Sequence, residues 1–220
     1  MLRVSARNGL KKQSSEFCVL WVAFLLQKWV VRMSSALDKN WLRFTRDANG
    51  LILDCGCGIG LWKASLESRG KVVGVDIDKN YLKQALYENM ILCSATHLPF
   101  DDGTFNFVWA AALIEHVKDD CIDEIQRVGK HVVITTPNNR SPLDIVNRVL
   151  RRPSWFSSPS HVRAYSGSDL RKYGRVYGCS CGLPKRSFWQ KFIPQRFWLL
   201  FPRLSHSFLL EILPKVAAYQ

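Results

Sequence analysis

Two apolar runs, each ending in an acidic residue, enclose a glycine-rich turn. Residues 51–53 are Leu-Ile-Leu and lead into Asp54, and glycines follow at positions 56, 58 and 60. Residues 72–75 are Val-Val-Gly-Val and lead into Asp76. Short apolar runs of this kind predict strands that are buried on both faces of a parallel sheet. The pattern therefore predicts a strand–helix–strand unit with an acid at the end of each strand.

The glycine turn is suited to a ligand. Glycines let the backbone approach a bound group with no side chain in the way. Residues 61–68 are expected to form the helix, ended by Arg69 and Gly70. Free N–H groups at a helix N-terminus favour a carboxylate or phosphate, and Asp76 can accept hydrogen bonds from ribose hydroxyls. These features predict a site for a cofactor that contains a nucleoside.

The glycine spacing distinguishes two kinds of cofactor. The dinucleotide fingerprint G-x-G-x-x-G requires its third glycine where this chain has Leu61. Here the third glycine, Gly60, comes one residue early, which weakens a nicotinamide prediction. The pattern Asp-x-Gly-x-Gly-x-Gly resembles instead that of the class I methyltransferases that use S-adenosyl-L-methionine (SAM). Within this class, the chain resembles the methyltransferase type 11 domain family of the small-molecule and lipid branch.

Further segments continue the resemblance in the same order along the chain. They are residues 94–100 (similar to the adenine-side segment), 101–109 (a turn and the fourth strand), 113–117 (the segment after that strand), 125–138 (a helix and the fifth strand) and 161–170 (the segment after the fifth strand). Residues 207–213 fit a last strand. The resemblance implies an α/β fold with a Rossmann-like, seven-stranded, mostly parallel sheet sandwiched by helices, whose last strand is antiparallel.

The resemblance also implies which residues hold SAM. It assigns Asp54 and the glycine turn to the methionine part of the donor, Asp76 to the ribose and Ile77 to the adenine. The complete set of expected donor-binding residues is Asp54, Cys55, Gly56, Cys57, Gly58, Gly60, Asp76, Ile77, Ser94, Ala95, Thr96 and Ala111. Many family members have an acid where this chain has Ser94, so Thr96 or backbone groups are alternative partners for the adenine amino group.

Methyl transfer requires alignment of donor and acceptor and, for an oxygen or nitrogen acceptor, a base. Imidazole titrates near neutral pH, and the resemblance places two histidines on the acceptor side. His161 and His116 are therefore the first candidate bases, and Glu115 is the third. No metal site is predicted. Cys179 and Cys181 are separated by a single residue and lack a second pair nearby, which favours an ordinary sixth strand over zinc.

Positive charge gathers at the two ends of the chain. The net charge is +13, and residues 140–220 hold fourteen Lys and Arg against three acids, whereas residues 33–139 hold eleven against fourteen. Because the ends usually shape the acceptor pocket in this fold, the charge predicts an anionic acceptor or anionic surroundings. Charge dispersed for solubility is the alternative. The seven scattered cysteines are an odd number, typical of a reducing cytoplasm rather than a disulfide framework.

Two segments are expected to flank or cover the site. Residues 1–45 are expected to form a helical segment that packs on the core, covers the pocket or lies on a membrane surface. A signal peptide or anchor is the alternative, and Met33 is an alternative start. Residues 46–220 would form the methyltransferase domain. Within it, residues 184–205 mix aromatics, cations and prolines, which indicates a substrate-covering insertion, a membrane-interface contact or an irregular helix on the core.

The sequence thus predicts a SAM-dependent methyltransferase. The acceptor atom would be an oxygen, nitrogen or carbon of a small-molecule or lipid-linked compound. The protein is expected in the cytoplasm, where it could also bind peripherally at a membrane surface. Two alternatives stay open. One is an RNA methyltransferase that binds phosphates through the basic C-terminal third. The other is a methyltransferase-like binding module without catalysis.

Overall fold

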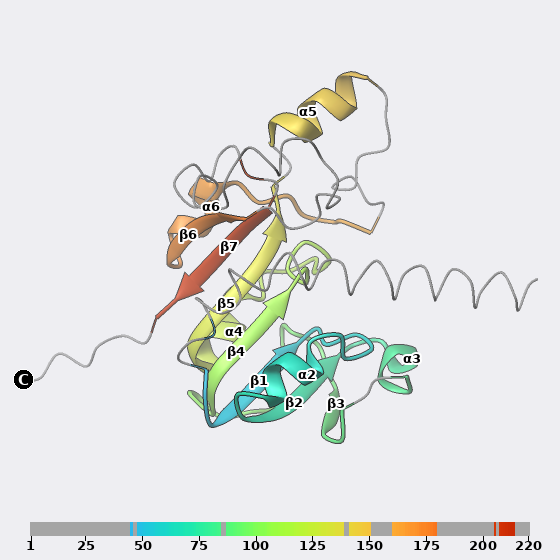
Figure 1. Cartoon of the computed structure of the whole chain (residues 1–220), viewed down its shortest axis with the longest axis vertical. Helices are drawn as coiled ribbons and strands as arrows, with labels where there is room; N and C mark the ends of the chain where they lie inside the picture. Colours follow the sequence, from blue (N-terminus) through green and yellow to red (C-terminus); the bar gives the residue numbers. More distant parts are fainter. Residues whose placement is uncertain are drawn as a thin grey trace, which may run out of the picture.

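Seven strands form one sheet in the order β3-β2-β1-β4-β5-β7-β6 (Figure 1). The structure is a computed structural model that describes residues 45, 48–84, 87–138, 141–150, 160–179, 205 and 207–213. The strands are β1 (Leu51–Cys55), β2 (Lys71–Asp76), β3 (Met90–Leu92), β4 (Phe105–Ala111), β5 (Gly129–Pro137), β6 (Arg175–Cys179) and β7 (Ser207–Ile212). Neighbouring strands from β3 to β5 pair in parallel, and β7 pairs antiparallel with both β5 and β6. The predicted mostly parallel, Rossmann-like sheet with an antiparallel last strand is confirmed.

Helices cover both faces of this sheet. They are α2 (Lys63–Glu67), α3 (Lys79–Leu82), α4 (Ile122–Val128), α5 (Pro142–Val149) and α6 (Gly167–Arg171). Side chains alternate along a strand, so that Ile52 and Leu53 of β1 belong to two separate core clusters. The cluster of Leu53 includes Ile125 of α4, and the cluster of Ile52 includes Leu66 of α2. Burial on both faces explains why the strands were recognisable as uninterrupted apolar runs.

The helix after β1 is shorter than expected. Gly56, Gly58 and Gly60 all have positive φ, at 72°, 52° and 82°. A right-handed helix cannot include such residues, and the turn continues past them, because the Lys63 N–H donates to the Gly60 carbonyl three residues back. The helix α2 therefore begins at Lys63, two residues later than expected. The helix ends where expected, with the Gly70 N–H donating to the Leu66 carbonyl.

Several predicted features lie outside the described residues. They are the N-terminal segment 1–45 except Thr45, the insertion at 184–205 except Ser205, and Cys181. Within the described part of the chain, no helix has the length and apolar character to cross a membrane. The cysteines that the structure describes lie at positions 55, 57, 93, 121 and 179, and no disulfide bond joins any two of them.

Candidate functional site

The glycine turn is folded back onto the end of β2. The N–H groups of Gly56 and Cys57 both donate to the Val75 carbonyl, each at a donor–acceptor distance of 2.9 Å. Gly56 has no room for a side chain, because a Cβ there would lie 2.7 Å from Cδ1 of Leu113. A Cβ at Gly58 would meet nothing within 4 Å. The turn therefore brings bare backbone against the loop after β4 at Gly56 and faces open space at Gly58.

Asp76 connects this turn to the residues after β2. Its Oδ2 accepts a hydrogen bond from the Gly58 N–H at 2.8 Å, and its Oδ1 accepts one from the Asp78 N–H at 2.9 Å. A carboxylate oxygen can accept two hydrogen bonds. Each oxygen of Asp76 can therefore accept a further hydrogen bond from a ligand hydroxyl.

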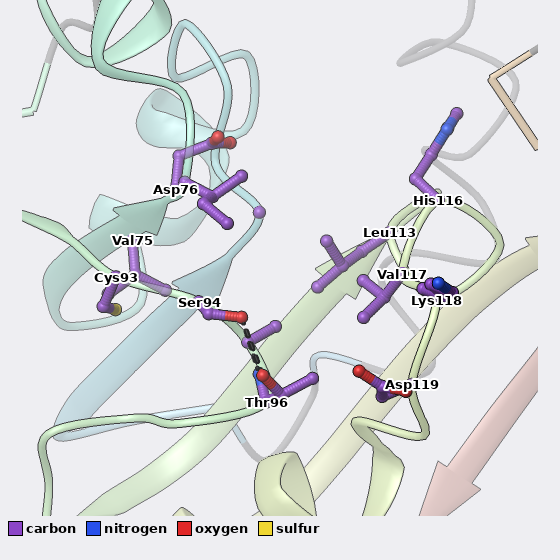
Figure 2. A pocket seen from close by; sticks show the side chains of 13 residues that line it. Val75, Asp76, Cys93, Ser94, Thr96, Leu113, His116, Val117, Lys118 and Asp119 are labelled. Atoms are coloured by element: carbon purple, nitrogen blue, oxygen red, sulfur yellow. Dashed lines mark hydrogen bonds between the residues drawn. The ribbon is translucent and has the colours of Figure 1, made fainter. Parts of the chain in front are cut away.

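A cavity of about 260 Å³ opens beside Asp76. Figure 2 shows the ends of β2 and β3 on one side of it and the loop after β4 on the other. The cavity is somewhat smaller than the roughly 300 Å³ at which ordinary ligand pockets begin, so the described walls enclose part of a drug-sized molecule. Its lining residues are Gly56, Val75, Asp76, Ile77, Cys93, Ser94, Ala95, Thr96, Leu113, His116, Val117, Lys118 and Asp119.

Half of the expected donor-binding residues line this cavity. These are Gly56, Asp76, Ile77, Ser94, Ala95 and Thr96. The others are not among its lining residues: Asp54, Cys55, Cys57, Gly58, Gly60 and Ala111. Four of this second group are buried: Asp54, Cys55, Cys57 and Gly60. The cavity also includes Leu113, Val117, Lys118 and Asp119, which had no assigned role in the sequence.

Asp54 is a buried acid held by a tyrosine. It is 1% exposed, and the Tyr87 hydroxyl donates to its Oδ2 at 2.6 Å. Burial raises the pKa of Asp54 to about 7; the Tyr87 hydrogen bond opposes this rise, and the nearby Asp76 charge adds to it. Tyr87 lies 33 residues away in sequence, and no local pattern predicted it as a partner.

A chain of hydroxyl contacts runs along the part of the cavity wall that was expected on the adenine side, called here the adenine-side wall. Ser94 Oγ and Thr96 Oγ1 are 2.8 Å apart, and Thr96 Oγ1 lies 2.9 Å from Nδ1 of His97. The Ser94–Thr96 contact is the dashed line in Figure 2. The Ser94 hydroxyl is already hydrogen-bonded to Thr96. It therefore has fewer free hydrogen-bonding positions for an adenine amino group than the carboxylate that many family members have at this position.

An ion pair on α4 fixes the loop that follows this wall. Glu124 accepts from the Leu98 N–H at 2.8 Å, and Arg127 donates to the carbonyls of Leu98 and Phe100 at 3.1 and 2.8 Å. Arg127 also donates to Glu124 and Asp102. The Arg127 hydrogen bond lowers the pKa of Glu124 to about 2. The sequence offered only a weak signal for this clamp, namely an acid and an arginine three residues apart on a helix.

The structure brings the three candidate bases together. Glu115 and His116 follow β4, and His161 lies 45 residues further along the chain. Potential ligand atoms of all three lie within 4.8 Å of one another, and the rings of the two histidines meet edge to face at 4.8 Å between centroids. In Figure 2 the His116 ring points away from the Ser94–Thr96 pair. The cluster therefore lies on the cavity's far side from the adenine-side wall.

Burial shifts the pKa values of two members of this cluster in opposite directions. Glu115 is 2% exposed, and burial raises its pKa to about 7, although hydrogen bonds that it accepts from its own backbone and from Thr136 oppose the rise. Burial lowers the pKa of His116, against a hydrogen bond to the Ser160 carbonyl. Both shifts favour the neutral form.

Comparisons with known proteins find similarity over part of the chain. Residues 53–133 match the family described as "Methyltransferase domain" (Methyltransf_11). An uncharacterized protein of Methanocaldococcus jannaschii is 36% identical over 98 residues, which are 42% of this chain and 43% of that protein. A demethylmenaquinone methyltransferase of Staphylococcus epidermidis is 35% identical over 91 residues, 36% of this chain and 38% of the relative. The chain thus spans less than half the length of these curated relatives.

A solved structure extends the likeness to most of the fold. A SAM-dependent methyltransferase from Archaeoglobus fulgidus superimposes with a TM-score of 0.57 at 16% identity, over 86% of this chain and 98% of that one. At this identity the likeness concerns the fold. It agrees with the strand order and with the antiparallel β7 described above.

Proposed function

We propose that the chain transfers a methyl group from SAM to an acceptor molecule, because residues 53–133 match a family of methyltransferase domains. SAM, the methyl donor that the family implies, supplies a methyl group on a positively charged sulfur. The residues of the chain bind this donor, align it with the acceptor and exclude water. The curated relatives share less than half of their length with this chain, so the proposal also needs support from the geometry of the site.

The observation that carries the proposal is the position of Asp76. Its carboxylate lies at the end of β2 and on the cavity wall, and the Gly58 and Asp78 N–H groups fix its orientation. Two hydroxyls on neighbouring carbons of a ribose match two carboxylate oxygens that can each accept a further hydrogen bond. Ile77 follows directly and is 72% exposed beside the cavity, where it would contact the adenine. The chain therefore offers a fitting site to the nucleoside half of SAM.

The acceptor is proposed to enter opposite the adenine side. There the cluster of Glu115, His116 and His161 offers a carboxylate and two imidazoles to the proton of an oxygen or nitrogen nucleophile. The name of the Staphylococcus epidermidis relative, demethylmenaquinone methyltransferase, supports a small-molecule or lipid-linked acceptor. The excess of Lys and Arg in residues 140–220 supports an anionic one. Residues 1–45 and 184–205 are proposed to cover this side, in the cytoplasm or at a membrane surface.

Calorimetry with S-adenosylhomocysteine tests the donor site. Asp76→Ala is expected to weaken binding by roughly 1.5–3 kcal/mol, or about 10- to 150-fold, because it removes charged hydrogen bonds to the ribose. Asp78→Ala is the matched control, because it removes the same charge two residues away and outside the cavity lining. Unchanged affinity in Asp76→Ala would place the ribose elsewhere.

Two further outcomes would replace the proposal. If the wild-type chain binds neither SAM nor S-adenosylhomocysteine at high micromolar concentration, the chain is a binding module and not a methyltransferase. If it binds the donor and also binds RNA with an affinity that falls steeply with salt, the acceptor is RNA. Indifference to RNA favours the small acceptor.

A further inference from the structure

Glu115, His116 and His161 have a composition that suits a metal ion better than a set of separate bases. We propose that these three residues bind one divalent transition-metal ion, and that this ion holds an oxygen atom of the methyl acceptor. The site itself follows from the geometry of the three side chains. The role toward the acceptor rests on the proposed methyltransferase function.

One oxygen of the buried Glu115 carboxylate is available to a ligand. Glu115 Oε2 accepts a hydrogen bond from the Thr136 hydroxyl at 3.0 Å, whereas Oε1 is buried and has no hydrogen-bond partner among the described residues. Within that part of the chain, no lysine or arginine forms an ion pair with Glu115. A buried carboxylate is costly unless a cation or hydrogen bonds compensate it. Oε1 therefore lacks the partner that a metal ion would supply.

The orientation of His116 also suits a metal ligand. Its Nδ1 lies 3.1 Å from the Ser160 carbonyl oxygen. A carbonyl oxygen only accepts, so Nδ1 carries the hydrogen, and in the neutral ring Nε2 has a free lone pair. Histidine ligands of metals ordinarily donate their other N–H in this way, to a carbonyl or a carboxylate. The hydrogen bond to Ser160 and the one from Thr136 to Glu115 together form the outer support expected of a metal site.

Backbone hydrogen bonds hold the two ligand segments next to each other. The N–H groups of Val162 and Arg163 both donate to the Glu115 carbonyl, at 2.9 and 3.1 Å. These bonds place His161 against the loop that carries Glu115 and His116. Side chains that lie 45 residues apart in sequence are thereby fixed as one cluster. Ligands held by backbone in this manner need little reorganisation to bind an ion.

The distances are compatible with a single ion. Metal–ligand bonds of about 2.1 Å imply ligand atoms roughly 3.0–3.4 Å apart in tetrahedral or octahedral geometry. The three candidate atoms lie within 4.8 Å of one another. Binding an ion would require rotation about the side-chain bonds of His116, which is exposed, and of His161, which is half-buried, to close this difference. The donor set suits Zn²⁺, Fe²⁺, Co²⁺ or Mn²⁺ better than Ca²⁺ or Mg²⁺, which favour sites built from oxygen alone.

Three protein ligands leave positions open on the ion, as in catalytic metal sites. His116 also lines the cavity beside Asp76, so an ion at this cluster would border the space assigned to the donor. An acceptor hydroxyl bound to the ion loses its proton to solvent more easily. Its oxygen then forms a bond to the methyl carbon while the carbon–sulfur bond breaks, and the electron pair of that bond stays on sulfur. The inferred acceptor class is therefore an oxygen nucleophile that can coordinate a metal.

Titration of the full, chelator-treated chain with Co²⁺ tests the site. We expect one equivalent to bind with the weak visible bands of nitrogen and oxygen ligands, and without the strong near-ultraviolet band of thiolate ligands. His161→Ala is expected to weaken Co²⁺ binding at least 30-fold. Thr136→Val, which removes only the supporting hydrogen bond to Glu115, is expected to weaken it about 10- to 100-fold. His97→Ala is the control, because His97 is an exposed histidine outside the cluster.

The outcomes separate the metal site from the methyltransferase proposal. His161 does not line the donor cavity, so His161→Ala is expected to bind S-adenosylhomocysteine like the wild type. Binding of S-adenosylhomocysteine without stoichiometric Co²⁺ binding would overturn the metal site and leave the proposed function standing. Co²⁺ affinity that is equal in the wild type, His161→Ala and Thr136→Val would also overturn it. Loss of donor binding with intact Co²⁺ binding would instead remove the proposed function and the role assigned to the ion.

Discussion

Two regions of the molecule meet at one end of the sheet but are built in different ways. The donor region, residues 51–96, contains the glycine turn, Asp76 and the Ser94–Thr96 wall, and consists of neighbouring strands β1, β2 and β3. The cluster region joins the loop after β4 to the segment around His161, across 45 residues of sequence. In the donor region strand ends and positive-φ glycines determine the geometry. In the cluster region long-range backbone hydrogen bonds to Glu115 determine it.

This difference explains what each region can tolerate. In the donor region individual residues such as the positive-φ glycines determine the backbone geometry, so the effect of a single substitution on stability or donor binding can be predicted from that residue's own contacts. A cluster assembled over long range depends on the docking of a whole segment. The two regions touch where Gly56 approaches Leu113, the residue two positions before Glu115. Substitutions in the donor region can therefore show how far the two regions are independent.

The largest expected effect is on the pH dependence of stability, through Asp54. Its pKa is about 7 in the folded chain and 3.8 when unperturbed. Between these values the folded state keeps a proton that the unfolded state has lost, so the free energy of unfolding falls as pH rises through this window. Asp54→Asn removes this titration. The variant should gain stability relative to the wild type from pH 4 to pH 8, by up to about 4 kcal/mol.

Urea unfolding at a series of pH values measures this difference. Asp78→Asn is the control, because Asp78 is a carboxyl at the surface end of the neighbouring strand–helix connection. A difference between Asp54→Asn and the wild type that stays constant from pH 4 to pH 8 would show that Asp54 is ionised throughout. The donor region would then contain a buried charge, and Tyr87 would be its essential partner.

The next largest effect is expected at the contact between the two regions. Gly56→Ala puts a side chain on a residue with φ of 72° and 2.7 Å from Leu113. Backbone strain of about 1–2 kcal/mol and displacement of Leu113 together should cost roughly 3 kcal/mol of stability. Gly58→Ala has the same kind of strain at φ of 52° but open space around it, and should cost only about 1 kcal/mol.

A double-mutant cycle separates the two causes. In a Leu113→Ala background, Gly56→Ala should cost about 1–2 kcal/mol less stability than it costs in the wild type. The shortened side chain at position 113 removes the close contact, and only the backbone strain at position 56 is left. Co²⁺ binding in Gly56→Ala then reports whether the displaced loop carries Glu115 and His116 with it. If the two glycine variants lose equal stability, the contact with Leu113 has no energetic weight and the regions are independent.

Sequence reasoning predicted the strands well where both of their faces are buried. Residues 51–53, 72–75 and 131–138 were expected as strands and correspond to β1, β2 and β5. The prediction did not include β3, which has three residues, or α3, which has four. Elements this short contain too little of a periodic pattern to distinguish them from turns. The predicted start of α2 was two residues early, because the Lys63 N–H closes a three-residue turn with the Gly60 carbonyl before the helix begins.

The lining of the cavity was predictable from the sequence where its residues lie in local motifs. Gly56, Asp76, Ile77 and the residues of the adenine-side wall follow from a motif and from strand ends, and they line the cavity. Tyr87 and Arg127 were missed because their partners lie 33 and up to 29 residues away. His116 and His161 were each candidates, but nothing in the sequence showed that their rings would meet. Their catalytic role stays a prediction.

The smallest expected effect tests the adenine position without disturbing the fold. Ile77 is 72% exposed beside the cavity, so Ile77→Ala should leave the free energy of unfolding nearly unchanged. If adenine covers this side chain, the loss of apolar contact should weaken S-adenosylhomocysteine binding by about 1 kcal/mol, or roughly fivefold. Leu92→Ala is the matched control, because Leu92 is an exposed apolar residue on the neighbouring strand β3, 54% exposed and outside the cavity lining. Equal affinity in the two variants would place the adenine away from Ile77. Nucleoside recognition in the donor region would then depend on the Asp76 carboxylate, without the contact from the adjacent Ile77 that the sequence motif implies.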